Sequence, residues 1–118
     1  MIFLLIFIGG GLGSVSRFGI GKAIPLFYSG KFPLGTLIVN TLACLLVGIV
    51  LYLFKDKLTT SENLRYFVII GFCGGFSTFS AFSLETVKLM QDGLIAYAFV
   101  NILVSLSIGF GVIYLLIR

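Results

Sequence analysis

The segment from residue 71 to residue 83 contains the residue types that could most clearly carry chemistry. It reads Gly-Phe-Cys-Gly-Gly-Phe-Ser-Thr-Phe-Ser-Ala-Phe-Ser, so that two adjacent glycines precede the hydroxyl residues Ser77, Thr78 and Ser80. Glycine costs about 1 kcal/mol relative to alanine in a helix, and hydroxyl side chains compete for backbone groups. We therefore expect a helix to break here. Backbone groups exposed at such a break inside a membrane become ion ligands, which predicts ion handling.

The same segment carries Phe76, Phe79 and Phe82 at a spacing of three. If helical geometry resumes after the break, the three rings would stack along one side. A phenyl ring has a negative face and a positive edge, so ring edges can line a path for an anion. A phenylalanine stripe in a membrane helix usually faces lipid or core, and only its fusion to the hydroxyl-rich break favours the anion path.

Asn40 and Asn101 lie inside other apolar stretches of the chain. An amide in hydrocarbon must find hydrogen-bond partners or lose several kcal/mol. Each asparagine is therefore either a tie between helices or part of a polar pathway, and both interpretations stay open. Tyr97 and Ser105 share a helical face with Asn101 at a spacing of four, which makes all three weaker candidates for a pore lining.

Arg17 and Glu85 are the charged residues closest to the apolar interior. At the bilayer centre each would cost roughly 2.5 to 3.5 kcal/mol, but both are near predicted helix ends, where snorkelling reduces that cost. One interpretation is interfacial anchoring. In the other, Arg17 lends positive potential to an anion vestibule, and Glu85 holds a polar track through hydrogen bonds.

Several enzyme classes are excluded by residue types that the chain lacks. It has no histidine, only four carboxylates and two cysteines. Cys44 and Cys73 both fall in apolar stretches, where a free cysteine usually behaves as a small hydrophobe. Neither a zinc site nor a Ser-His relay can be assembled from this set, so we expect no enzyme.

These candidate residues must be positioned by membrane helices. The chain of 118 residues is 59% hydrophobic and only 10% charged, and its mean hydropathy is +1.21. About 20 apolar residues cross the hydrocarbon as a helix. We predict an all-α integral membrane protein, one domain over residues 1–118, with the third of four helices broken in mid-membrane. The expected helices cover residues 2–24, 34–54, 63–91 and 94–117.

Alternating helix direction distributes the basic residues evenly between the two sides of the bilayer. Four are expected on one side, namely Lys55, Lys57, Arg65 and Arg118, and four on the other, namely Arg17, Lys22, Lys31 and Lys88. Orientation normally follows an excess of Lys and Arg on the cytoplasmic side. The equal count is either accidental or indicates insertion in both directions, in which case the chain can pair with an inverted copy of itself.

Residues 74–82, Gly-Gly-Phe-Ser-Thr-Phe-Ser-Ala-Phe, closely resemble the signature of the fluoride channels of the Fluc (CrcB) family, whose third helix is interrupted at this point. Residues 35–40, Gly-Thr-Leu-Ile-Val-Asn, look like the family's second-helix motif. Residues 10–17 resemble its glycine-rich first helix and arginine. The length and the four-helix plan also match, so the resemblance covers nearly the whole chain.

The resemblance implies an antiparallel, dual-topology homodimer with two fluoride pores in the lipid bilayer. Phe79 and Phe82 would correspond to the family's phenylalanine box, which contacts fluoride edge-on, and Asn40 would be the pore-lining amide. Ser80 would belong to a track of hydroxyls beside the rings, but Ala81 stands where many members have threonine. One hydroxyl of that track is therefore expected to be missing.

The resemblance also implies a structural sodium ion, buried between the two subunits. Main-chain carbonyls that map to Gly74 and Ser77 would hold it. Ser77 replaces the family's common threonine, and because the ligand is a backbone carbonyl we expect little effect.

We expect a passive, fluoride-selective channel that exports cytoplasmic fluoride across the cell membrane of a microbe and binds no nucleic acid. The alternative is a small proton-coupled multidrug exporter, which would share the four helices and the dual topology. An exporter needs a carboxylate deep in a substrate-binding helix. The first helix has none, the chain has no tryptophan to stack on cationic drugs, and Glu85 is close to a helix end.

Overall fold

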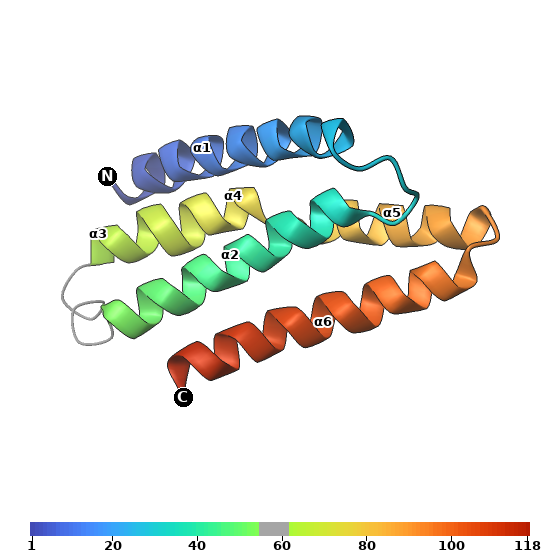
Figure 1. The fold of residues 1–118 in the computed structure, drawn as a ribbon. Coiled ribbons are helices and arrows are strands. Elements are labelled where there is room, and N and C mark those ends of the chain that lie inside the picture. Colours follow the sequence, from blue (N-terminus) through green and yellow to red (C-terminus); the bar gives the residue numbers. More distant parts are fainter. Residues whose placement is uncertain (55–61) are drawn as a thin grey trace.

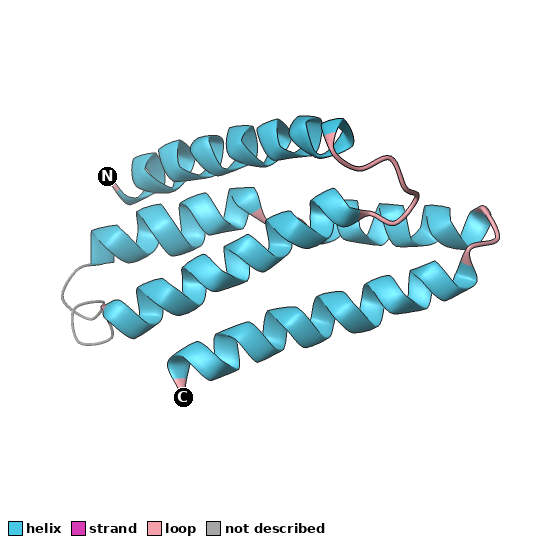
Figure 2. Ribbon diagram, viewed as in Figure 1, coloured by secondary structure: helices cyan, strands magenta, loops and turns pink. Residues whose placement is uncertain are grey.

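The computed structural model describes residues 1–54 and 62–118, and every regular element in these ranges is helical. The elements are α1 (Ile2–Ala23), η1 (Ile24–Leu26), α2 (Leu34–Leu53), α3 (Glu62–Leu64), η2 (Arg65–Cys73), α4 (Gly74–Phe76), α5 (Phe79–Gln91) and α6 (Ile95–Ile117). Figure 2 shows these helices joined by short loops.

The helices form four segments that are each long and apolar enough to cross a membrane, namely Ile2–Leu26, Leu34–Leu53, Glu62–Gln91 and Ile95–Ile117. The shortest, α2, has 20 residues, which corresponds to a length of about 30 Å and matches the thickness of the hydrocarbon. The prediction of four membrane helices is confirmed.

The third segment is broken, as the sequence predicted, and the break is short. It consists of Ser77 and Thr78, both in extended conformation, between α4 and α5. Gly74 and Gly75, expected to weaken the helix, remain helical in α4. The preceding nine residues of η2 form a π-helix, a wider turn that is often found near functional sites.

The four segments pack as two pairs, which Figure 1 shows side by side. Segment α1 lies against η2 and α4, while α2 lies against α6, and α5 extends along the other end of α6. The break thus lies where the third segment passes from the first pair to the second.

Glycines bring α1 close to the third segment. Gly9 and Gly13 are buried, and a Cβ on Gly13 would collide with the backbone carbonyl of Phe72. From the opposite side, a Cβ on Gly75 would collide with the carbonyl of Gly10. Small residues allow this backbone approach between membrane helices, where van der Waals packing drives association.

Phe76 does not continue the stripe of rings that its spacing suggested. It is buried and stacks on Phe72, with ring centroids 5.4 Å apart and an interplanar angle of 16°. It joins Val39 and Ala43 in the small core between α2 and the third segment. The expectation of three stacked rings was wrong because the break at residues 77 and 78 changes the chain direction between Phe76 and Phe79.

Basic residues lie at both ends of the bundle. Lys22 and Lys88 are in the last turns of α1 and α5, at the end that also holds the loop with Lys31. Arg65 begins η2 and Arg118 follows α6, both at the other end. The two further lysines that the sequence placed there, Lys55 and Lys57, lie outside the described residues.

Candidate functional site: a broken helix between two cavities

Hydrogen bonds to side chains fix the geometry of the break. The backbone N–H of Thr78 donates to Oδ1 of Asn40 on α2, at 3.1 Å. Thr78 caps α5, because its Oγ1 accepts from the N–H of Ala81 at 3.3 Å. Ser77 turns its hydroxyl back to the carbonyl of Cys73, at 2.8 Å. The break is therefore held by specific bonds rather than left open.

These bonds free two backbone carbonyls. In a continuous helix the N–H of residue 78 would bond the carbonyl of Gly74, and the N–H of residue 81 would bond that of Ser77. Here the first N–H is diverted to Asn40 and the second to the side chain of Thr78. Gly74 and Ser77 thus lose their usual helical donors, and their carbonyl oxygens become available to a cation.

The next carbonyl is used by a charged side chain. Nε of Arg17 donates to the carbonyl of Gly75 at 3.3 Å, across 58 residues of sequence. The guanidinium of α1 is thereby tied to the third segment just before the break. The bond places a permanent positive charge beside the break, which the hypothesis of a snorkelling anchor does not require.

A cavity of about 310 Å³ opens on one side of the break. Asn40, Phe79, Phe82 and Ser105 line it, together with residues of α2, α6 and the end of η2. The two rings lie 5.9 Å apart with an interplanar angle of 41°. Phe79 is 79% exposed in the single chain, so its ring is not part of the packed core.

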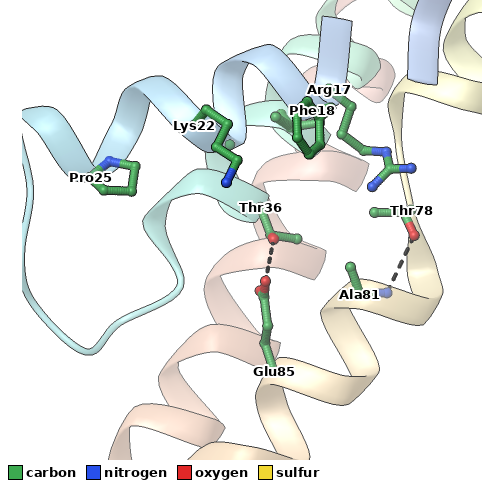
Figure 3. Close-up of a pocket in the computed structure, with 10 residues that line it drawn as sticks. Arg17, Phe18, Lys22, Pro25, Thr36, Thr78, Ala81 and Glu85 are labelled. Atoms are coloured by element: carbon green, nitrogen blue, oxygen red, sulfur yellow. Dashed lines mark hydrogen bonds between the residues drawn. The ribbon is translucent and has the colours of Figure 1, made fainter. Parts of the chain in front are cut away.

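A second cavity, of about 350 Å³, opens on the other side and is shown in Figure 3. It is lined by the basic side chains of Arg17 and Lys22 and by Thr36, Thr78 and Glu85. Thr36 donates to Oε1 of Glu85 at 2.9 Å. The second carboxylate oxygen, Oε2, is buried and has no hydrogen-bond partner within the described part of the chain.

Thr78 lines both cavities, so the break is their common wall. A cationic chamber thus lies directly beside an aromatic chamber that contains an amide and hydroxyl groups. Positive charge concentrates anions in such a cleft, and ring edges tolerate them further along. The arrangement is suited to moving a small anion past the break.

Asn101 occupies a different position from the other candidates. It is only 2% exposed, and its Nδ2 donates to Oγ1 of Thr86 at 2.9 Å. Thr86 in turn donates to the carbonyl of Phe82 at 2.7 Å, and Ser105 donates to Oδ1 of Asn101 at 3.2 Å. Of the two interpretations open for Asn101, the structure shows the tie between helices. This tie fixes α5, which carries the Phe82 ring, to α6.

The remaining candidates lie at the edges of the site. Ser80 is exposed, and its hydroxyl lies 3.0 Å from that of Thr78, so that either hydroxyl can donate a hydrogen bond to the other. Tyr97 is 46% exposed and packs edge-on against Phe32, with centroids 6.3 Å apart. The structure thus brings Ser80 to the break but places Tyr97 against the loop before α2.

One site residue, Thr86, had been given no role from sequence. Thr36 is one helical turn before Asn40, and this spacing already predicts that it shares the inward face of its helix. Thr86 is one turn after Phe82, so the same spacing could have found it. Their partners, Glu85 and Asn101, are 49 and 15 residues away and were not predictable from that spacing.

Comparison with known proteins agrees with this architecture. The family model described as CrcB-like protein, Camphor Resistance (CrcB), matches residues 4–117. A protein of Pyrococcus horikoshii named fluoride-specific ion channel FluC is 42% identical, over 97% of this chain and 91% of its own length. A protein of the same name from Desulforapulum autotrophicum is 40% identical, over 92% of this chain and 87% of its own length. Another, from Azobacteroides pseudotrichonymphae, is 46% identical, over 84% of this chain and 82% of its own length.

Both the structure and these matches bear on where the protein resides. Four helices that can cross a membrane, in a chain matched by a membrane channel family over nearly its whole length, make it a multi-pass membrane protein. The resemblance read from the signature at residues 74–82 is confirmed by the family match over residues 4–117, and the chain belongs to the CrcB family.

Proposed function

We propose that the chain is a subunit of a passive, fluoride-selective channel that lets cytoplasmic fluoride leave the cell. Its relatives are named fluoride-specific ion channels, which supports this function. The single observation that carries the proposal is the break itself. Thr78 separates a chamber containing Arg17 and Lys22 from one containing Asn40, Phe79 and Phe82.

Each chamber has a distinct task in this proposal. The basic chamber raises the local concentration of anions. The aromatic chamber then replaces part of the water shell with ring edges, amide and hydroxyl donors, and a narrow path of this kind favours a small anion over chloride. No step requires an energy source, because fluoride moves down its own electrochemical gradient.

The rival function, a proton-coupled multidrug exporter, has no support from the family match or the named relatives. An exporter of that kind needs a carboxylate deep in a substrate-binding helix, and α1, Ile2–Ala23, contains neither Asp nor Glu. Glu85, the carboxylate at the site, is already held by Thr36.

The functional unit in this proposal is an antiparallel homodimer. The sequence predicts four basic residues on each side of the bilayer, and such a balance permits insertion in both orientations. A single chain leaves Phe79 79% exposed beside an open cavity, and an inverted second copy would cover that ring and close the path. The dimer would thus contain two equivalent pores related by a two-fold axis.

A structural sodium ion fits the carbonyls of Gly74 and Ser77. Both oxygens have lost their helical donors, as described above, and oxygen ligands suit hard cations. When bound, the ion would supply a positive charge that holds the two breaks together at the dimer centre. In this proposal Asn40 and Thr78 serve the ion indirectly, by keeping the carbonyls free.

Fluoride efflux from liposomes tests the channel. Purified protein is reconstituted, valinomycin clamps the potential, and electrodes record fluoride or chloride release from separately loaded vesicles. We expect rapid fluoride release without chloride release, and loss of that release in Phe82→Ile. Phe3→Ile, at an 87% exposed ring on α1, is the control and should conduct normally. Equal release by the Phe82→Ile protein would contradict the assigned pore, and silence of the folded parent protein would contradict the channel.

A further inference from the structure

Cys44 and Cys73 have no role in the proposed channel, yet both line the cavity that contains the two phenylalanine rings. Cys44 lies on α2 and is half-buried, and Cys73 ends η2 and is 4% exposed. Neither forms a disulfide. The chain therefore presents two free thiols to one cavity.

The register between the two helices places these thiols at nearly the same level. Figure 1 shows α2 and the segment from α3 to α4 running in opposite directions. Phe76 packs with Val39 and Ala43 of α2, so it lies at the level of about residue 41 of that helix. Cys73 is three residues before Phe76, and Cys44 is three residues after that level of α2. Because the two helices are antiparallel, both positions lie about 4.5 Å from Phe76 in the same direction along the helix axes.

The surroundings favour a metal ion that binds the two sulfur atoms and needs no further protein ligand. Oδ1 of Asn40 already accepts from Thr78, and the hydroxyl of Ser77 already donates to the carbonyl of Cys73. Within residues 1–54 and 62–118, no three His, Cys, Asp or Glu side chains gather closely enough to hold a metal ion. Four-coordinate zinc is thus poorly served, whereas soft cations prefer sulfur ligands.

We propose that Cys44 and Cys73 form a two-coordinate site for a soft, thiophilic divalent cation such as Hg²⁺. Each thiol loses its S–H proton to solvent and forms one S–Hg bond, so that one Hg²⁺ and two thiols give a neutral dithiolate and two protons. No oxidant is required. A divalent ion is favoured over a monovalent one by the charge of the product. Two thiolates and a divalent ion form a neutral complex, whereas two thiolates and a monovalent ion would bury a net negative charge among apolar walls.

Occupation of this site has a consequence that rests on the proposed channel function. The cavity is also lined by Asn40, Phe79 and Phe82, so a bound ion would lie in the fluoride path. Fluoride flux should then fall as the ion binds. Binding itself does not depend on the channel function, so the two can be tested separately.

The binding test uses the detergent-purified protein and mercuric chloride alone. We expect mass spectrometry under native conditions to show one Hg²⁺ per chain, and X-ray absorption to show two sulfur neighbours. In Cys44→Ser and Cys73→Ser, only one thiol remains. Linking two binding groups raises avidity by about 10² to 10⁴-fold, so a monothiol competitor should strip mercury from these variants at concentrations at least 10²-fold lower.

Two results of the binding test would overturn the site. If the monothiol competitor removed mercury from the parent and from both single variants at the same concentration, the two thiols would not share an ion. A mercury-linked covalent dimer on a non-reducing gel would mean that the ion bridges two chains. Because X-ray absorption is recorded on the parent protein, the proposal stays testable even if a serine variant fails to fold.

The flux test compares each liposome preparation with its own untreated sample. We expect Hg²⁺ to reduce fluoride efflux from the parent at least 10-fold, and a monothiol wash to restore efflux only in the single-cysteine variants. Unchanged efflux with mercury demonstrably bound would show that the site lies off the fluoride path. Absent efflux before mercury is added would refute the channel and leave the binding result standing.

Discussion

Thr86 and Asn101 allow a quantitative test of how the site is held. Thr86→Val keeps the shape of the side chain but removes its Oγ1, which accepts from Asn101 at 2.9 Å and donates to the carbonyl of Phe82 at 2.7 Å. The carbonyl can still accept its backbone helical bond, so that loss should be small. The amide of Asn101 is only 2% exposed and would lose a partner that water cannot replace.

The cost follows from that burial. An unsatisfied buried donor costs about 1–3 kcal/mol, while measured bonds between membrane helices average about 0.6 and reach about 1.7 kcal/mol. Because Asn101 is almost fully enclosed, we expect the upper part of the membrane range, about 1–1.7 kcal/mol, for Thr86→Val. The double variant Thr86→Val/Asn101→Leu leaves no unpaired amide, so it should be less destabilised than the sum of the two single changes by about 1 kcal/mol.

Unfolding in sodium dodecyl sulfate, followed by far-ultraviolet circular dichroism in mixed micelles, measures these free energies. Ser107→Ala, at an exposed position of α6, is the control and should be neutral. Fluoride efflux should also fall in Thr86→Val, because α5 carries the Phe82 ring. Strictly additive free energies, or unchanged efflux in the destabilised protein, would refute the reasoning that this tie positions the ring.

Three further predictions concern other contacts of the site. Gly13→Ala should destabilise the protein by about 1–3 kcal/mol, because its Cβ would collide with the third segment, whereas Gly19→Ala has open space and should be neutral in the same unfolding assay. Thr36→Val removes the donor to Glu85 and should lower fluoride efflux several-fold, and Thr36→Ser should restore it; equal efflux from both variants would argue against a role for this bond. Asn40→Leu removes the acceptor of the Thr78 N–H, which can then return to the carbonyl of Gly74 and occupy a proposed sodium ligand. For a bond worth about 1 kcal/mol, about fivefold more sodium should be needed to retain the dimer on size exclusion. An unchanged sodium requirement would separate Asn40 from the proposed ion site.

The sequence alone determined the membrane architecture and the approximate place of the break. Long uncharged apolar stretches are stable in hydrocarbon, and the thickness of the bilayer sets the length that crosses it. Four membrane-spanning segments therefore followed directly. Adjacent glycines and hydroxyl residues weaken a helix locally, which located the break within residues 71–83. These are properties of neighbouring residues and need no knowledge of what packs against them.

Tertiary structure decided which residues form the break and which polar groups bind one another. Ser77 and Thr78 are extended, while Gly74 and Gly75 stay helical, because Asn40, distant in sequence, takes the N–H of Thr78. The same kind of long-range partnership made Asn101 a tie between α5 and α6. In an apolar interior every polar group must find a partner, and only the packing of the helices determines which partner is within reach.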